Sequence, residues 1–215
     1  VEAIIDIRES SNSKIVKAVE EAGIKIHWSH TIVDTSGYKR LNGISAMKLS
    51  NDGLSVTGNK INISCDCLGV AGGWTPAVHL FTQSGGKLKF DENDKIFLPN
   101  KYPSEQLSVG SCNGDFKLKE IINNLSINLK QFLKVNETDF DNILIEGEEE
   151  NSKRNIWLLP SDKPIGKTKP FVDYQNDATA KDIKLALREG FRSIEHVKRY
   201  TTTGMGTDQG KLGNM

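Results

Sequence analysis

The chain has 215 residues, of which 37% are hydrophobic, a length that accommodates one large domain or two small ones. Lys and Arg together number 28, as do Asp and Glu, so no net charge favours binding to nucleic acid or to an anionic membrane. No apolar run approaches the ~20 residues that cross a bilayer, and three cysteines are too few for a disulfide framework, which favours a reducing cytoplasm.

The first predicted elements form a β-α-β unit. The apolar run at residues 1–7 predicts a buried strand, and because the chain starts inside this run we expect it to be an interior piece of a longer polypeptide. A helix capped by Asn12 or Ser13 is predicted to stop at Gly23. The alternating residues 24–28 predict a second strand, and this order of elements is typical of a parallel sheet.

An antiparallel hairpin is predicted next, with strands at residues 44–50 and 54–64 joined by an Asn-Asp-Gly turn. His27 and His30, just before it, have the spacing of a possible metal site. Side chains three apart in a strand point to opposite faces, so we do not expect the two histidines to share an ion.

Two glycine-containing segments are predicted to be buried strands, CDCLGVAGGWTP at residues 65–76 and EQLSVGSCNGDF at 105–116. A short helix at 76–83 and a hairpin at 85–99 are expected between them. Parallel sheets bind ligands where their strands end, and glycine lets the backbone approach a nucleotide closely. These two segments therefore predict a nucleotide-binding edge.

The second half of the chain changes in character after a long amphipathic helix that starts at Leu118. The predicted division is an α/β region over 1–135, a linker over 136–170 with one short strand at 156–160, and a small, mainly helical module over 171–215. In that module, a strand at 170–175 is followed by two helices. The first is predicted to open with a capping box, Thr179-x-x-Asp182, and to end at Gly190.

The order of these segments resembles the closing part of the pyridine nucleotide-disulfide oxidoreductase architecture, a Rossmann-like fold with two dinucleotide domains. One family resembles the chain closely, the α subunit of heterotetrameric sarcosine oxidase. The resemblance covers essentially the whole chain and is strongest in GVAGGWTPAVHLFTQSGGKLKFDE, FVDYQNDATAKDI and REGFRSIEHVKRYTTTGMGTDQGK.

This resemblance implies a complex that oxidises sarcosine to glycine, with hydrogen peroxide and either formaldehyde or methylene-tetrahydrofolate as further products. It implies NAD in the α subunit, FMN at the boundary between α and β, FAD in the β subunit, and γ and δ subunits as further partners. The glycine-rich dinucleotide loop and the folate-binding domain of that family are expected outside these residues. By itself the chain is expected to be inactive, with no catalytic residue of its own.

The same resemblance implies a set of cofactor-contacting residues. Ser111 stands where FAD-binding relatives have an aspartate for the flavin ribitol, which argues against FAD here and is compatible with NAD. The expected contacts lie at the two glycine segments and in a loop near the flavin: Gly72, Gly73, Gly110, Ser111, Thr203, Gly204 and Gly206.

The C-terminal module resembles a small [2Fe–2S]-binding domain of related amine and proline dehydrogenases. Asp173, Gln175 and Asp208 stand where the cysteines of that domain would be, and residues 113–215 contain no cysteine. Because such a cluster needs thiolates, we expect no iron–sulfur cluster and no metal site. Two alternatives stay open: a non-catalytic scaffold, and a subunit of a related amine or opine dehydrogenase.

Overall fold

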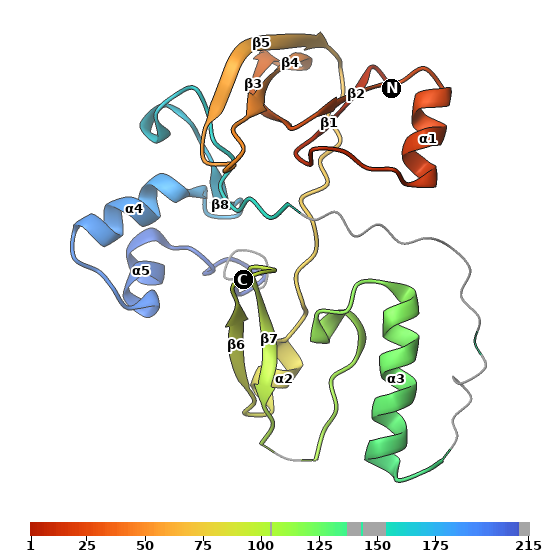
Figure 1. The fold of residues 1–215 in the computed structure, drawn as a ribbon. Coiled ribbons are helices and arrows are strands. Elements are labelled where there is room, and N and C mark those ends of the chain that lie inside the picture. Colours follow the sequence, from red (N-terminus) through yellow and green to blue (C-terminus); the bar gives the residue numbers. More distant parts are fainter. Residues whose placement is uncertain (104, 137–142, 144–153, 211–215) are drawn as a thin grey trace. The chain divides into compact units, whose positions relative to one another are not determined.

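The computed structural model describes residues 1–103, 105–136, 143 and 154–210 (Figure 1). These residues form short sheets and helices, which confirms the predicted α/β class, while the Rossmann-like arrangement stays a prediction. Backbone contacts group the chain into two compact units, one of residues 1–71 with 150–214 and one of residues 72–149. The boundaries predicted from composition, at residues 135 and 170, stay a prediction beside this division by contacts.

The first unit opens with the predicted β-α-β element. Strand β1 (Ala3–Asp6) pairs in parallel with β2 (Lys25–Trp28), and helix α1 (Lys14–Glu21) connects them. The side chain of Ser13 accepts a hydrogen bond from the N–H of Val16 at 3.3 Å, so Ser13 is the N-cap. Gly23 follows the helix with a φ of 74°, a conformation that glycine adopts without steric cost.

An antiparallel sheet follows, with β4 (Leu41–Leu49) between β3 (His30–Gly37) and β5 (Val56–Ser64). The hairpin of β4 and β5 was predicted from the sequence, but β3 was not. The reversal that starts β3 occurs at Ser29, whose φ of 53° turns the chain out of β2. The core of this sheet is on β4, where four apolar side chains are buried: Ile44, Ala46, Met47 and Leu49.

Residues 154–163 return the chain to this unit and are held on it by charge. The Lys163 ammonium lies 2.5 Å from the Asp34 carboxylate on β3, and the Lys60 ammonium on β5 lies 2.8 Å from the Asp162 carboxylate. The strand predicted at 156–160 is wrong, because those residues are irregular and pair with no described strand. An apolar sequence becomes a strand only where a partner strand supplies the hydrogen bonds.

The C-terminal part of this unit has the predicted helices. Strands β8 (Phe171–Asp173) and β9 (Ala178–Thr179) form a two-stranded sheet after a short 3₁₀ turn, η2 (Ile165–Lys167). Helices α4 (Ala180–Arg188) and α5 (Ile194–Thr201) follow.

The predicted capping box of α4 is confirmed. Asp182 Oδ2 accepts hydrogen bonds from the N–H of Thr179 at 2.8 Å and from its hydroxyl at 2.6 Å. Ala186 on α4 and Val197 on α5 are buried, and they mark the core of this small module. The last turn of α4 is closed by Gly190, as predicted.

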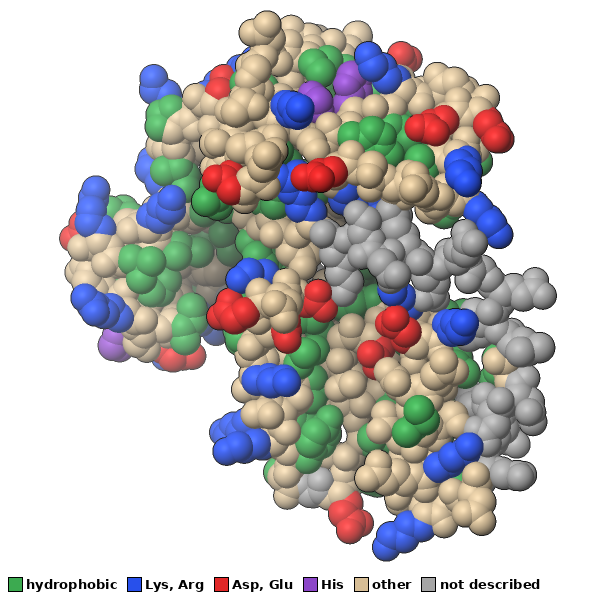
Figure 2. Space-filling model, viewed as in Figure 1, with side chains coloured by type: hydrophobic (Ala, Val, Ile, Leu, Met, Phe, Trp, Pro, Cys, Tyr) green, Lys and Arg blue, Asp and Glu red, His purple; other side chains and the backbone are tan. Residues whose placement is uncertain are grey.

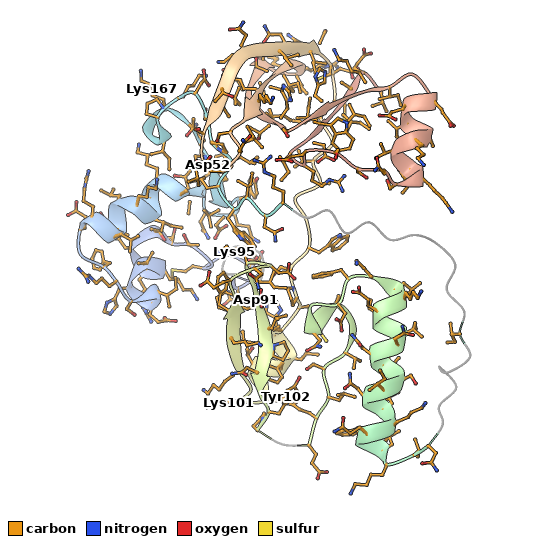
Figure 3. All side chains as sticks on the ribbon, viewed as in Figure 1. Asp52, Asp91, Lys95, Lys101, Tyr102 and Lys167 are labelled. Carbon is orange, nitrogen blue, oxygen red and sulfur yellow. The ribbon has the colours of Figure 1, made fainter. Side chains whose placement is uncertain are left out.

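The second unit contains helix α2 (His79–Gln83), the antiparallel strands β6 (Lys87–Asp91) and β7 (Ile96–Lys101), the 3₁₀ turn η1 (Gly110–Asn113), and helix α3 (Leu118–Leu133). The short helix, the hairpin and the long helix were all predicted. The turn of the hairpin is built on the Asp91 carboxylate, which accepts the N–H groups of Asn93 and Asp94 at 3.0 and 2.9 Å. Asp91 is labelled with Lys95 and Tyr102 in Figure 3.

The two glycine-containing segments are not strands, which corrects the prediction for residues 65–76 and 105–116. Residues 65–76 are irregular and pair with no described strand, and the side chains of Val70 and Trp74 are 79% and 84% exposed. In the second segment, the positive φ of Gly110, 75°, starts η1 and ends the extended backbone at Val109. Neither segment therefore forms the edge of a parallel sheet in the described part of the chain.

Charged side chains of both signs are dispersed over the face of the molecule drawn in Figure 2. Figure 2 shows Lys and Arg mixed with Asp and Glu on the face that it draws, in agreement with their equal numbers in the sequence. Among the described residues, no helix is both long enough and apolar enough to cross a membrane.

Candidate functional site

The best-defined arrangement of polar groups lies where the 201–210 loop meets strand β8. The loop begins at Thr201, the last residue of α5, and the chain reverses at Thr202, whose φ is 60°. Gly204 and Gly210 also have positive φ, at 70° and 80°. These turns bring the loop back against the segment that follows β8.

Asp173, at the end of β8, is the centre of this arrangement. Its side chain is 6% exposed, and its carboxylate accepts four hydrogen bonds. Oδ2 accepts the Gly204 N–H at 2.7 Å and the Asn176 side-chain amide at 3.2 Å, while Oδ1 accepts the N–H groups of Gln175 and Asn176 at 2.8 and 3.2 Å. These bonds, chiefly the one from the Gly204 N–H, hold the pKa of Asp173 below its usual value.

Gln175 makes a second connection to the loop. Its Oε1 atom accepts both the N–H and the hydroxyl of Thr207, each at 2.7 Å. Gly206 lies against this amide. A Cβ at position 206 would lie 2.9 Å from Gln175 Cδ and would overlap Oε1. Glycine at position 206 is thus what lets the loop approach Gln175.

The threonine hydroxyls at the start of the loop are also bound inside the molecule. Thr201 and Thr203 are buried, their hydroxyl oxygens lie 2.7 Å apart, and the Thr201 hydroxyl donates to the Val197 carbonyl at 2.8 Å. The Thr202 hydroxyl donates to the Thr201 carbonyl at 2.6 Å. The hydroxyls therefore stabilise the end of α5 and the first turn of the loop.

Three predicted cofactor-contacting residues, Thr203, Gly204 and Gly206, lie in this loop. Their role toward a cofactor stays a prediction. The N–H of Gly204 donates to Asp173, and the N–H of Thr203 donates to the Thr201 hydroxyl at 3.3 Å, so both donors already have partners in this chain. A neighbouring molecule would therefore contact the outer surface of the loop and would not bind these two N–H groups.

The other predicted cofactor-contacting residues lie in the second unit. A Cβ at Gly72 or Gly73 would meet nothing within 4 Å, so the backbone there can be approached closely. Gly110 is buried with a positive φ, and Ser111 is exposed at the first turn of η1. Their binding role also stays a prediction, and the structure describes the two sets of residues in different units.

Sequence reasoning missed the hydrogen bonds from Asp173 and Gln175 to the loop. The sequence predicted a strand over 170–175, in which Asp173 and Gln175 would share a face. The structure ends β8 at Asp173 and places Gln175 in the turn that follows, so that pattern did not describe the real arrangement. The sequence could not identify their partners, since Gly204 is 31 residues from Asp173. Asp208, the third position compared with cysteine, accepts the Gly210 N–H at 3.2 Å within the loop itself.

The geometry of the histidine pair also differs from the prediction. The rings of His27 and His30 lie with their centroids 5.6 Å apart, so the two side chains meet and do not point to opposite faces. The cause is the positive φ of Ser29, which breaks the strand between them. The described residues contain no group of three or more His, Cys, Asp or Glu side chains that could hold a metal ion.

The chain resembles known proteins over its whole length. It is 30% identical over 226 residues to the sarcosine oxidase subunit alpha of Corynebacterium sp. (strain P-1), which covers 100% of this chain and 23% of that protein. It is 34% identical over 191 residues to that of Rhizobium meliloti (strain 1021), with 83% of this chain and 18% of the relative covered. The corresponding subunit of Corynebacterium sp. (strain U-96) is 28% identical over 224 residues, with 100% and 23% covered.

A crystal structure of L-proline dehydrogenase from P. horikoshii has a similar fold. Its TM-score is 0.57 at 20% sequence identity, and the match covers 98% of this chain and 42% of that chain. At this identity the likeness concerns the fold alone.

A family model locates the resemblance within the chain. The sarcosine oxidase A3 domain matches residues 167–215, which contain β8, β9, α4, α5 and the 201–210 loop. The chain spans about a quarter or less of the length of the curated relatives it matches. The predicted resemblance is therefore confirmed: this chain is similar to a portion of the sarcosine oxidase α subunits, and its residues 167–215 match their A3 domain.

Proposed function

We propose that the chain is part of the α subunit of a sarcosine oxidase complex, an oxidoreductase that acts on a secondary amine with oxygen as acceptor. The observation that carries this proposal is the similarity to three sarcosine oxidase α subunits, at 28% to 34% identity over most or all of the chain. The complex would oxidise sarcosine to glycine and release hydrogen peroxide, with formaldehyde or methylene-tetrahydrofolate as the one-carbon product. The cytoplasm is the proposed location.

Within this complex the chain would support a nucleotide, with NAD as the proposed ligand. Gly72 and Gly73 fit that role because their backbone is open on the side where a Cβ would lie. Gly110 and Ser111 would lie at the second contact, where the positive φ of Gly110 shapes the turn and the Ser111 hydroxyl is accessible. A bound NAD would supply hydride chemistry; these four residues would bind and orient it.

The 201–210 loop would form part of the surface toward FMN and the β subunit. Its buried donors are used inside the module, so Thr203, Gly204 and Gly206 would act by fixing the shape of that surface. FAD would belong to the β subunit, and the γ and δ subunits would complete the heterotetramer. This chain would support the assembly and contribute no catalytic residue.

The test is a visible spectrum of the full-length subunit purified together with its neighbouring gene products, before and after anaerobic addition of sarcosine. Flavin bands that bleach with sarcosine are the expected result. A preparation that binds flavin but bleaches only with another amine would replace sarcosine by that amine and support a related dehydrogenase. A colourless preparation would refute the proposal in favour of a non-catalytic scaffold.

A further inference from the structure

The 201–210 loop is attached to the rest of its module at two points that lie three residues apart along the loop. Asp173 binds the N–H of Gly204, and Gln175 binds the N–H and hydroxyl of Thr207. We propose that Asp173 and Gln175 form a latch that fixes the conformation of this loop, and that opening the latch releases the loop while α4 and α5 stay folded. The inference does not depend on the proposed function.

The carboxylate of Asp173 connects two pieces of chain at once. Oδ1 accepts two N–H groups of its own turn, from Gln175 and Asn176, and Oδ2 accepts the N–H of Gly204 from the loop. A nearly buried carboxylate has to keep such donors, because the alternative is a buried charge without partners. The hydrogen bond from Gly204 therefore does two things: it holds the loop, and it helps to keep the buried carboxylate of Asp173 ionised.

Gln175 closes the latch from the same side of the segment. Its amide oxygen carries two hydrogen bonds from Thr207, and the lack of a side chain at Gly206 makes room for that amide. Because the side chain of Gln175 is exposed, water can replace these bonds more easily than those of Asp173. We expect Asp173 to be the stronger point of the latch and Gln175 the weaker.

The loop has a backbone conformation that the latch must stabilise. Thr202 is β-branched and has a φ of 60°, a left-handed conformation that such residues rarely adopt because Cβ comes too close to the backbone. A strained residue of this kind persists only where its surroundings determine its conformation. The hydroxyl pair of Thr201 and Thr203 fixes one end of the turn, and the Asp173–Gly204 bond fixes the other.

The experiment is hydrogen–deuterium exchange, read by mass spectrometry, on the full-length protein and on three variants. Asp173→Asn replaces one carboxylate oxygen by a donor, and we expect peptides of the 201–210 loop to exchange at least ~10-fold faster while peptides of α4 keep their rates. Gln175→Ala should accelerate the same peptides by a smaller factor. Asp177→Asn is the matched control; Asp177 is exposed, makes none of the bonds described above, and should leave the loop unchanged.

Each outcome of the exchange experiment either supports the latch or overturns it. Unchanged loop exchange in both Asp173→Asn and Gln175→Ala would overturn the proposal. If Asp173→Asn also accelerates α4, the module has lost its fold, and Gln175→Ala decides alone, since its exposed side chain can be removed without loss of core. A chelator added to the unmodified protein should leave the loop rates as they are, and an acceleration by chelator would mean that a metal holds the loop.

Discussion

Replacing Arg154 by alanine should destabilise the first unit more than replacing an exposed arginine such as Arg199. The guanidinium of Arg154 reaches the segment that follows β1 and the turn that follows β4. Nη1 donates to the Ile7 carbonyl at 2.8 Å, and Nη2 donates to the Ser50 carbonyl at 2.7 Å and to the Asn51 carbonyl at 3.3 Å. One side chain thus joins parts of the unit that are more than 100 residues apart in sequence.

The size of the effect follows from these bonds. A hydrogen bond from a charged donor contributes about 1.5–3 kcal/mol, and the lower half applies here because Arg154 is only partly buried. The Ser50 carbonyl keeps a second donor, the N–H of Gly53 at 2.9 Å, so the loss of its hydrogen bond to Arg154 costs less free energy. Two short bonds then give about 3 kcal/mol, which corresponds to a fall in the melting temperature of roughly 6–12 °C.

Urea unfolding and thermal melting of purified variants measure this loss. Arg154→Lys keeps the charge but cannot reach all three carbonyls, so its stability should fall between the native protein and Arg154→Ala. Arg199→Ala is the matched control, because Arg199 is an exposed residue whose ion pair with Glu195 on α5 should contribute only about 0.3–0.5 kcal/mol. If Arg154→Ala costs no more than Arg199→Ala, Arg154 does not hold the unit together.

Three further changes test the local structure. Asp182→Ala removes the acceptor for the Thr179 N–H and should cost about 1 kcal/mol in urea unfolding. Gly206→Ala pushes aside the exposed Gln175 side chain, which loses its bonds to Thr207, and should cost about 0.5–1.5 kcal/mol. Gly166→Ala, with nothing within 4 Å of the new Cβ, should change stability by less than about 0.5 kcal/mol. Burial, and then the charges of Lys25 and His30, lower the pKa of His27 from its ordinary value of 6.5. As the pH falls through 6.5, the unfolded chain therefore gains a proton on His27 before the folded chain does, and the free energy of unfolding should decrease. His27→Gln should make the free energy of unfolding less dependent on pH in this range.

The elements that the sequence predicted are those with a local cause. Ser13 caps α1, the Thr179–Asp182 pair caps α4, and Gly23 and Gly190 end their helices, all through contacts within a few residues. The two predicted hairpins likewise depend on turns between adjacent strands. Each of these signals contains both partners of the interaction in one short stretch, so composition and spacing suffice to find it.

The predictions that were wrong concern strands, whose formation depends on partner strands elsewhere in the sequence. Residues 65–76 and 105–116 have the composition of buried strands, yet a strand exists only with a neighbour, and the described sheets offer them none. Strand β3 was missed for the converse reason, since its partner β4 fixes a segment whose own pattern is weak. Ser29 shows the limit most clearly, because one positive φ both starts β3 and brings His27 beside His30.

The candidate site combines both cases. The sequence identified the loop by its glycines and threonines and predicted that it contacts a cofactor. In the structure the N–H groups of Gly204 and Thr207 donate to Asp173 and Gln175. At Gly204 and Thr207 a molecule that meets this loop would therefore find N–H groups that already have partners in this chain. Tyr174 and Met205, 80% and 53% exposed, lie next to latch residues in sequence. The latch fixes the backbone at Gly204 and Thr207, on both sides of Met205. The loop would therefore not have to become ordered when a partner contacts Met205, which lowers the entropic cost of binding that partner.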